Sequence, residues 1–506
     1  MKNLLQRFVL TAVLLPALIL RIWKIEDRLP YVYHPDEPRW VQISQNIFKT
    51  GDLNPHFFNY PSMLFYVNAA AYVPYYWIGK AIGTFKNPQD ILPAQNQVMG
   101  SYFVPYPSTM IMARLISVLF SLATVGLVYY LGKRLDGPAV GLLAALLLAV
   151  EPTHIDNSRI VGPDVLMTFF CVAALAFSLR ILERGRLRDY LAAGSAVGLA
   201  AAAKYNALPI AALIPVAHAL HRDRPLLDRR LAYAPLAGIA MFLLIVPFAV
   251  FDFRTFIRKV LFEASHYSRA GHPGMEGKAL FWYLHYMAKT GALIYLFAAL
   301  QILRGIRQRH RGVILLSAFP LIYFAFISLM KVRNDRTFLP IIPFAALLAA
   351  QLILWLHHEI RQRTKSKFSF AALFLALLAL LQPLRITHRD LSARLQPDSR
   401  DLAREWVYAH VPQGSKIALE SYSPYIDPQR YQVQGFRALI EQPPDAFLEQ
   451  GFQVLIFSRG MYGRFFREPQ RYADEIARYR ALFDRFPLLQ SFNGGGYEVR
   501  IHRVVP

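Results

Sequence analysis

Apolar stretches long enough to cross a lipid bilayer recur along most of this chain, and they constrain its fold more than any other feature. Taking ~20 apolar residues as one membrane span, we count about eleven candidate transmembrane helices. Hydrophobic residues make up 55% of the 506 positions and charged residues only 18%, as in polytopic membrane proteins. The candidate spans are residues 4–23, 109–131, 138–151, 165–181, 190–204, 206–220, 231–250, 287–303, 312–330, 338–356 and 368–384.

Basic residues in alternate connections between these spans indicate the orientation. If the N-terminus is cytoplasmic, every basic cluster also falls on the cytoplasmic side, which is the positive-inside pattern. The clusters are Lys133 and Arg134; Arg180, Arg184, Arg186 and Arg188; Arg222, Arg224, Arg229 and Arg230; Arg304, Arg307, Arg309 and Arg311; and Arg361, Arg363, Lys365 and Lys367. The sequence predicts a multi-pass protein of the cell membrane with a cytoplasmic N-terminus.

The formal charge of +23 follows from the same pattern. We attribute it to membrane topology and to contact with anionic lipids, and expect no nucleic-acid partner. Cys171 is the only cysteine, which excludes an internal disulfide, a multi-cysteine metal site and a thiol redox pair. No histidine and cysteine cluster has the spacing of a metal site, so we expect no bound metal from such ligands, although a carboxylate pair is compatible with a divalent cation.

Two segments are predicted to lie outside the membrane. Residues 24–108 form a long external loop with surface helices at 38–48 and 61–83, because counting 61–83 as a span would invert all later basic connections. Residues 386–506 form a small extracytoplasmic α/β domain that follows a transmembrane module of residues 1–385. We expect a mainly α-helical polytopic protein. In the C-terminal domain we expect strands at 416–419, 454–457 and 497–505, and helices at 401–409 and 471–483.

The first external loop carries an acidic pair, Asp36-Glu37, and the predicted topology gathers further polar residues on the same side of the membrane. Ionisable groups at a bilayer surface are costly and are therefore functional candidates. A carboxylate can remove the proton of a hydroxyl nucleophile, and fixed cations can stabilise a phosphate leaving group. The candidate site residues are His34, Asp36, Glu37, Tyr60, Arg159, Asp164, Lys204, Tyr205, His266, Arg333 and Arg336.

Structural roles are alternatives for several of these residues. Asp36 and Asp164 lie where each caps a helix N-terminus, although capping explains only one acid of the first pair. Arg159 suits a membrane-edge anchor, and Arg333 and Arg336 suit snorkelling side chains. Lys204 lies inside an apolar hairpin, where a cation needs a partner or a role.

Five motifs occur in the order known from one enzyme family. They are His34-Pro35-Asp36-Glu37, Asn59-Tyr60-Pro61-Ser62, Arg159 through Asp164, Gly198 through Lys204-Tyr205, and Arg336-Thr-Phe-Leu-Pro340-Ile-Ile-Pro343. Together they cover much of residues 1–345. In this register the chain resembles the GT-C type membrane glycosyltransferases (glycosyltransferase family 39), especially protein O-mannosyltransferases and the bacterial aminoarabinose transferase.

The resemblance implies an inverting transfer of a sugar from a polyprenyl or dolichyl phosphate to a hydroxyl acceptor on the extracytoplasmic face. It implies that Asp36 is the general base, that Glu37 supports the acceptor or the fold, and that Asp164 is a second acid of the site. Lys204 and Arg336, with Arg333 beside them, are the candidates for the donor phosphate. Arg336 occupies the place of the family's Arg-Tyr pair, but the tyrosine is missing, since Thr337 and Phe338 follow.

Other functions remain alternatives at this point. They are an oligosaccharide ligase of the same fold, a lipid-sugar flippase or transporter, and a scaffold without activity. The absence of an inverted repeat and of paired broken helices disfavours a transporter, and the intact acidic pair disfavours a scaffold. The sequence does not distinguish a protein, a lipid or a glycan as acceptor.

Overall fold

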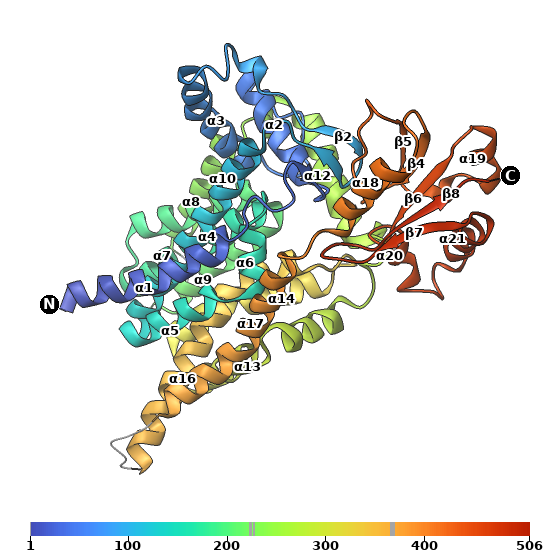
Figure 1. Cartoon of the computed structure of the whole chain (residues 1–506). Coiled ribbons are helices and arrows are strands. Elements are labelled where there is room, and N and C mark those ends of the chain that lie inside the picture. Colours follow the sequence, from blue (N-terminus) through green and yellow to red (C-terminus); the bar gives the residue numbers. More distant parts are fainter. Residues whose placement is uncertain (1, 222–224, 226–227, 365–369, 506) are drawn as a thin grey trace.

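The computed structural model describes residues 2–221, 225, 228–364 and 370–505. It contains a large helical module, an external loop region and a C-terminal α/β unit, which lies at one end of the molecule (Figure 1). Arg222, Arg224, Lys365 and Lys367 of the predicted basic clusters lie outside the described residues.

Six helices in the described part of the chain are long and apolar enough to cross a membrane, which makes the protein a multi-pass membrane protein. They are α4 (Pro107–Asp136), α7 (Pro163–Arg184), α13 (Ala279–Arg307), α14 (Arg311–Ser328), the continuous segment Asp335–Arg363, and α17 (Ala371–Ala393). That segment comprises α15 (Asp335–Phe338), η4 (Leu339–Ile341) and most of α16 (Ile342–Thr364).

The predicted number of about eleven spans is not confirmed. A seventh candidate is the pair α5 (Pro138–Ala149) and α6 (Pro152–Ser158), which is bent by 63°. The other predicted spans correspond to helices that are not among these candidates. They are α1 (Lys2–Ile22), α8 (Leu187–Ala203), η2 with α9 (Tyr205–Ala212, Leu213–Ala219) and α10 (Arg230–Ile245).

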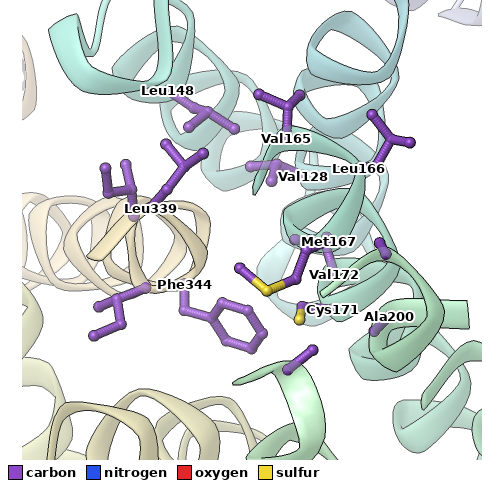
Figure 2. Packing of buried hydrophobic residues seen from close by; sticks show 14 of the residues in the cluster. Val128, Leu148, Val165, Leu166, Met167, Cys171, Val172, Ala200, Leu339 and Phe344 are labelled. Atoms are coloured by element: carbon purple, nitrogen blue, oxygen red, sulfur yellow. The ribbon is translucent and has the colours of Figure 1, made fainter. Parts of the chain in front are cut away.

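The core of the helical module lies around α7 and the segment Asp335–Arg363, whose most apolar stretches are 67% and 83% buried. Figure 2 shows Val165, Met167, Cys171 and Val172 of α7 among side chains from α4, α5, α8, η4 and α16. Cys171 is fully buried in this core. A helix that is apolar all round belongs in such a central position.

Helices α8 and α10 pack closely against each other. A Cβ atom at Gly194 would lie 2.0 Å from the Ala234 carbonyl oxygen, and one at Gly198 would lie 2.2 Å from the Gly238 carbonyl oxygen. Two glycines four residues apart on one face let two membrane helices approach to backbone contact. The C-terminal end of α8, where Lys204 follows, is fixed by this contact.

The external loop region contains the two predicted surface helices, α2 (Glu37–Thr50) and α3 (Met63–Ala81). Neither is among the candidate membrane spans of the described residues. The region also holds a three-stranded sheet of β1 (Tyr31–Val32), β3 (Ser101–Phe103) and β2 (Gln95–Val98), which the sequence analysis did not predict. The remaining short elements are η1 (Pro88–Asp90), which lies in the same region, and α11 (Phe248–Phe251), α12 (Phe253–Ser265) and η3 (His266–Ala270), which lie between α10 and α13.

The C-terminal unit has a five-stranded mixed sheet of order β5-β4-β6-β8-β7. Strands β4 (Lys416–Glu420), β6 (Val454–Ser458) and β8 (Val499–Arg503), with helices α18 (Ser399–His410) and α21 (Ala473–Arg485), match the predicted elements. Strands β5 (Gln432–Phe436) and β7 (Leu488–Phe492), and the short η5 (Leu439–Glu441), α19 (Pro444–Glu449) and α20 (Tyr462–Phe466), were not predicted.

Candidate active site

A cavity of about 640 Å³ lies between the external loop region, the helical module and the C-terminal unit. Its lining contains Asp36, Glu37 and Arg336 from the first two parts and Arg400 and Tyr497 from the third. Eight basic and five acidic side chains line it, so its field favours an anionic ligand. Most of the residues that the sequence analysis singled out lie in this cavity or directly behind it.

His34 shapes the turn that presents Asp36. Asp36 occupies the N-cap position of α2, but its side chain accepts no capping hydrogen bond. The Nδ1 atom of His34 accepts instead from the backbone N–H groups of Asp36 and Glu37, both at 3.2 Å. Burial lowers the pKa of His34 despite the nearby carboxylates of Glu37 and Asp36, which favours the neutral ring that this acceptor role requires. The carboxylate of Asp36 is thereby left for other partners.

Arg336 is such a partner. Its Nη1 atom lies 3.2 Å from Oδ2 of Asp36, and the two side chains are 25% and 34% exposed. Asn334 starts the short helix α15 by accepting the N–H of Thr337 at 2.8 Å, which fixes the turn that carries Arg336. The pair therefore combines a partly exposed base with a partly exposed cation at the cavity wall.

Glu37 has a different environment from Asp36. It is 1% exposed and forms a two-point ion pair with Arg114 of α4, at 3.0 Å and 2.9 Å. It also accepts the backbone N–H of Val161 at 2.8 Å. Burial alone would raise the pKa of Glu37, but the charge and hydrogen bonds of Arg114 lower it below its usual range. Glu37 thus holds α2 against α4 and the loop before α7.

Asp164 and Lys204 form the second ion pair of the site. The Nζ atom of Lys204 donates to Oδ1 of Asp164 at 2.7 Å, and both side chains are less than 10% exposed. Asp164 lies one residue inside α7, whose N-cap is Gly162, so this pairing and not capping explains its position. Lys204 ends α8 and has the partner that an intramembrane cation requires.

Tyr60 lies between the two ion pairs. The Nζ atom of Lys204 is 5.7 Å from the centre of its ring, and Trp40 of α2 packs edge-on against it at 5.5 Å. Burial raises the pKa of Tyr60 well above its usual value, and the nearby charges of Asp36, Asp164 and Arg336 also act on it. The site is therefore continuous from Asp36 to Lys204.

Arg159 is placed as a buried cation and not as a membrane-edge anchor. It is 3% exposed and lines the cavity, where it donates to the carbonyl oxygens of Trp23 and Lys24. Its Nε and Nη1 atoms have no hydrogen-bond partner among the described residues. Both atoms are shielded from solvent, so Arg159 is an incompletely paired cation in the cavity wall.

Three predicted residues lie away from Asp36. Arg333 points to the C-terminal unit, with its guanidinium 3.9 Å from Glu468, and lines a neighbouring pocket. His266 packs against His272, with ring centres 4.4 Å apart. The hydroxyl of Tyr205 donates to the Phe58 carbonyl at 3.1 Å, so Tyr205 fixes the loop before Tyr60.

Sequence reasoning missed the contribution of the C-terminal unit and of Arg114. Tyr33 donates to Asp401 at 2.6 Å and accepts from Arg404 at 3.0 Å, while the guanidinium of Arg400 lies 3.9 Å from its ring centre. These contacts hold the residue directly before His34. Arg114 lies within an apolar span, which is itself the signal that a partner such as Glu37 exists.

No group of histidine, cysteine, aspartate and glutamate side chains in the described ranges has the arrangement of a metal site. The ion pairs of Asp36 and Asp164 are satisfied by Arg336 and Lys204.

Comparison with known proteins adds a fold and a partial family match. Residues 107–251 match the family model described as dolichyl-phosphate-mannose-protein mannosyltransferase. No curated protein sequence matches the chain.

Among solved structures, ArnT from Cupriavidus metallidurans bound to undecaprenyl phosphate superposes with a TM-score of 0.53 at 15% identity. The match covers 99% of this chain and 98% of that one. The archaeal oligosaccharyltransferase AglB from Archaeoglobus fulgidus, in complex with an inhibitory peptide and a dolichol-phosphate, matches with a TM-score of 0.54 at 12% identity. It covers 92% of this chain and 71% of that one. These matches run through both the helical module and the C-terminal unit, and the chain is therefore a multi-pass membrane protein with the GT-C glycosyltransferase fold.

Proposed function

We propose that this protein transfers a sugar from a polyprenyl phosphate to a hydroxyl acceptor at the extracytoplasmic side of the membrane. The observation that carries the proposal is the pairing of a partly exposed carboxylate, Asp36, with a partly exposed cation, Arg336, in the wall of a cationic cavity. ArnT, which has the same fold, is known with undecaprenyl phosphate bound. A donor carried by a lipid also suits a site at the membrane surface.

In this reaction Asp36 is the general base. Its carboxylate takes the proton of the acceptor hydroxyl while the hydroxyl oxygen forms a bond to the anomeric carbon of the sugar. The bond between that carbon and the phosphate oxygen breaks on the opposite face, so the configuration inverts. The leaving phosphate gains negative charge, which Arg336 and Lys204 stabilise.

A donor phosphate would also act on the ion pair of Asp36 and Arg336. The Nη1 atom of Arg336 lies 3.2 Å from Oδ2 of Asp36. A donor phosphate competes for the same guanidinium and releases the carboxylate for proton abstraction. Lys204 is the second cation. It is buried and bonded to Asp164, which holds its ammonium group in place and shields it from solvent.

Asp36→Asn tests the base assignment. Purified protein is assayed for transfer from a polyprenyl phosphate sugar, and separately for binding of that donor. We expect donor binding to remain and transfer to fall at least about a hundredfold, which is a typical contribution of a general base. Asp52→Asn is the matched control, because Asp52 lies in the same external region and pairs only with its neighbours. Near-normal transfer by Asp36→Asn refutes the assignment, and movement of donor across vesicles without transfer favours a flippase.

The orientation is tested by labelling. We propose that the N-terminus is cytoplasmic and that residues 24–108 and 386–506 are outside. A Cys171→Ala variant carrying Asp52→Cys presents one exposed thiol in the external region, because Asp52 is 52% exposed. We expect a membrane-impermeant thiol reagent to label it in intact cells. Labelling only after cell lysis contradicts the proposed topology and with it an extracytoplasmic reaction.

A further inference from the structure

A second cavity of about 640 Å³ lies in the C-terminal unit, between α20, α21 and the loop before β8. Four arginines line it, Arg459, Arg467, Arg480 and Arg500, against a single carboxylate, Glu498. We call it the arginine pocket. None of these five residues contributes to the candidate active site.

Glu498 organises one wall of the arginine pocket. It accepts hydrogen bonds from Nε of Arg500 at 2.8 Å and from the hydroxyl of Tyr462 at 2.7 Å. Arg459 lies 3.9 Å from the same carboxylate and keeps 65% of its side chain exposed. Arg467 and Arg480 are exposed as well. Glu498 therefore orients Arg500 and lies near Arg459, and the four arginines of the pocket outnumber it.

Aromatic side chains form the other walls. Phe466 and Tyr497 are large apolar groups that remain 38% and 43% exposed at the pocket. Phe483 lies deeper, with the guanidinium of Arg500 5.2 Å from its ring centre. Aromatic faces pack against the C–H faces of sugar rings, and fixed N–H donors bind the hydroxyl and acid groups of sugars. The excess of positive charge selects an acidic sugar over a neutral one.

The arginine pocket adjoins the active-site cavity. Gly496 and Tyr497 line both. Their loop is fixed at the junction between the two parts of the chain, because Gly495 donates its N–H to the Pro397 carbonyl at 3.0 Å and accepts from Arg28 at 3.1 Å. A ligand that occupies the arginine pocket therefore ends beside the cavity that contains Asp36.

We propose that the arginine pocket binds an anionic saccharide portion of the acceptor, whose hydroxyl then enters the cavity of Asp36. Only the entry of the acceptor hydroxyl into the cavity of Asp36 rests on the proposed function. Binding of an anionic saccharide to the pocket is a property that is measured without any transfer.

The test is equilibrium binding to the full-length protein in lipid nanodiscs. The probes are a galacturonic acid tetramer, its fully methyl-esterified form, and inorganic phosphate. The variant is Arg459→Gln with Arg480→Gln, and the matched control is Arg478→Gln, which removes an exposed arginine two positions from Arg480 on α21 and outside the pocket. We expect the acidic tetramer to bind wild type and control equally, and the double variant about tenfold or more weakly, as for loss of charge-assisted hydrogen bonds.

The other probes separate the parts of the proposal. We expect the methyl ester and inorganic phosphate each to bind much more weakly than the acidic tetramer. The proposal is overturned if the tetramer does not bind, if the ester binds as tightly, or if the double variant is unaffected. Phosphate that binds as tightly as the tetramer also overturns it, because the pocket is then a simple anion site. Asp36→Asn must keep this binding, so loss of transfer in that variant leaves the inference intact, and loss of binding in the double variant leaves the base assignment intact.

Discussion

Asp36 and Glu37 are neighbours in the sequence, yet their carboxylates face opposite environments. Asp36 faces the cavity and Arg336, whereas Glu37 is buried against Arg114 and Val161. The sequence identified the pair but not this division, because one residue of rotation at the start of a helix decides which carboxylate turns inward. We therefore propose Asp36 as the reacting carboxylate and Glu37 as a positioning residue.

Glu37→Gln is expected to destabilise the folded protein by about 3 kcal/mol, because it leaves the buried guanidinium of Arg114 without a charged partner. The pKa of Glu37 is lower in the folded chain than its ordinary value of 4.5, so the ionised carboxylate contributes stability above that pH. This contribution is lost as the pH falls below 4.5. Thermal unfolding in detergent should show a lower midpoint for the variant at neutral pH and a smaller difference in acid. A constant difference at every pH argues against the ion pair.

Arg336 and Arg333 provide a matched pair for the donor site. Arg336→Gln should weaken binding of undecaprenyl phosphate by about tenfold or more, because a charge-assisted hydrogen bond to the phosphate is lost. Arg333→Gln should leave this affinity unchanged, because Arg333 faces Glu468 of the C-terminal unit. Direct binding of the lipid phosphate to both variants checks this prediction. Equal weakening by both substitutions would place Arg333 in the donor site as well.

At the scale of elements, contact between α8 and α10 determines where Lys204 lies. Gly198→Val should destabilise the protein by about 2 kcal/mol and weaken donor binding, because the side chain meets the Gly238 carbonyl, pushes α8 away from α10 and displaces the end of α8 that carries Lys204. Gly126→Val on α4 is the control, since nothing lies within 4 Å of a Cβ there. Thermal unfolding and donor affinity are measured for both. Normal donor affinity in Gly198→Val would separate this helix contact from the site.

The elements of the fold were predictable to different degrees. Long spans such as α4 and α7 and strongly patterned elements such as α2, β4 and α21 follow from hydropathy and periodicity. The bend of 63° between α5 and α6 was not predicted, although it falls at Pro152, where a proline interrupts the helix. Arg21 donates to the Ala149 carbonyl at 2.9 Å and accommodates the carbonyl groups at the break. Strands β1 and β5 were missed because one is two residues long and the other is mostly exposed and polar.

At the scale of the whole molecule, no sequence pattern indicated that the C-terminal unit completes the cavity. Docking of two units depends on single long-range contacts, which have no periodicity. Glu276 of the helical module pairs with Arg471, and Tyr33 bonds to Asp401 and Arg404. The C-terminal unit thus holds Tyr33, which lies directly before His34. It therefore takes part in positioning Asp36.

This coupling predicts the outcome of a double-mutant cycle. Tyr33→Phe and Arg404→Gln should each lower the rate of transfer about fivefold, equivalent to ~1 kcal/mol for one hydrogen bond, with donor affinity unchanged. Both substitutions break the same cluster, in which Arg404 donates to the Tyr33 hydroxyl at 3.0 Å and both side chains bond to Asp401. The double variant should therefore be little slower than either single variant.

Tyr31→Phe is the control for this cycle, because Arg404 packs on the ring of Tyr31, with its guanidinium 3.6 Å from the ring centre, and phenylalanine keeps that ring. We expect its rate to match wild type. Multiplicative effects of Tyr33→Phe and Arg404→Gln would mean that the two residues act independently. A fall in donor affinity would mean that the C-terminal unit acts on the lipid phosphate and not on the loop of Asp36. Since Tyr33 is joined to Asp36 through the two intervening residues His34 and Pro35, a coupled loss of rate at constant donor affinity is the result specific to positioning.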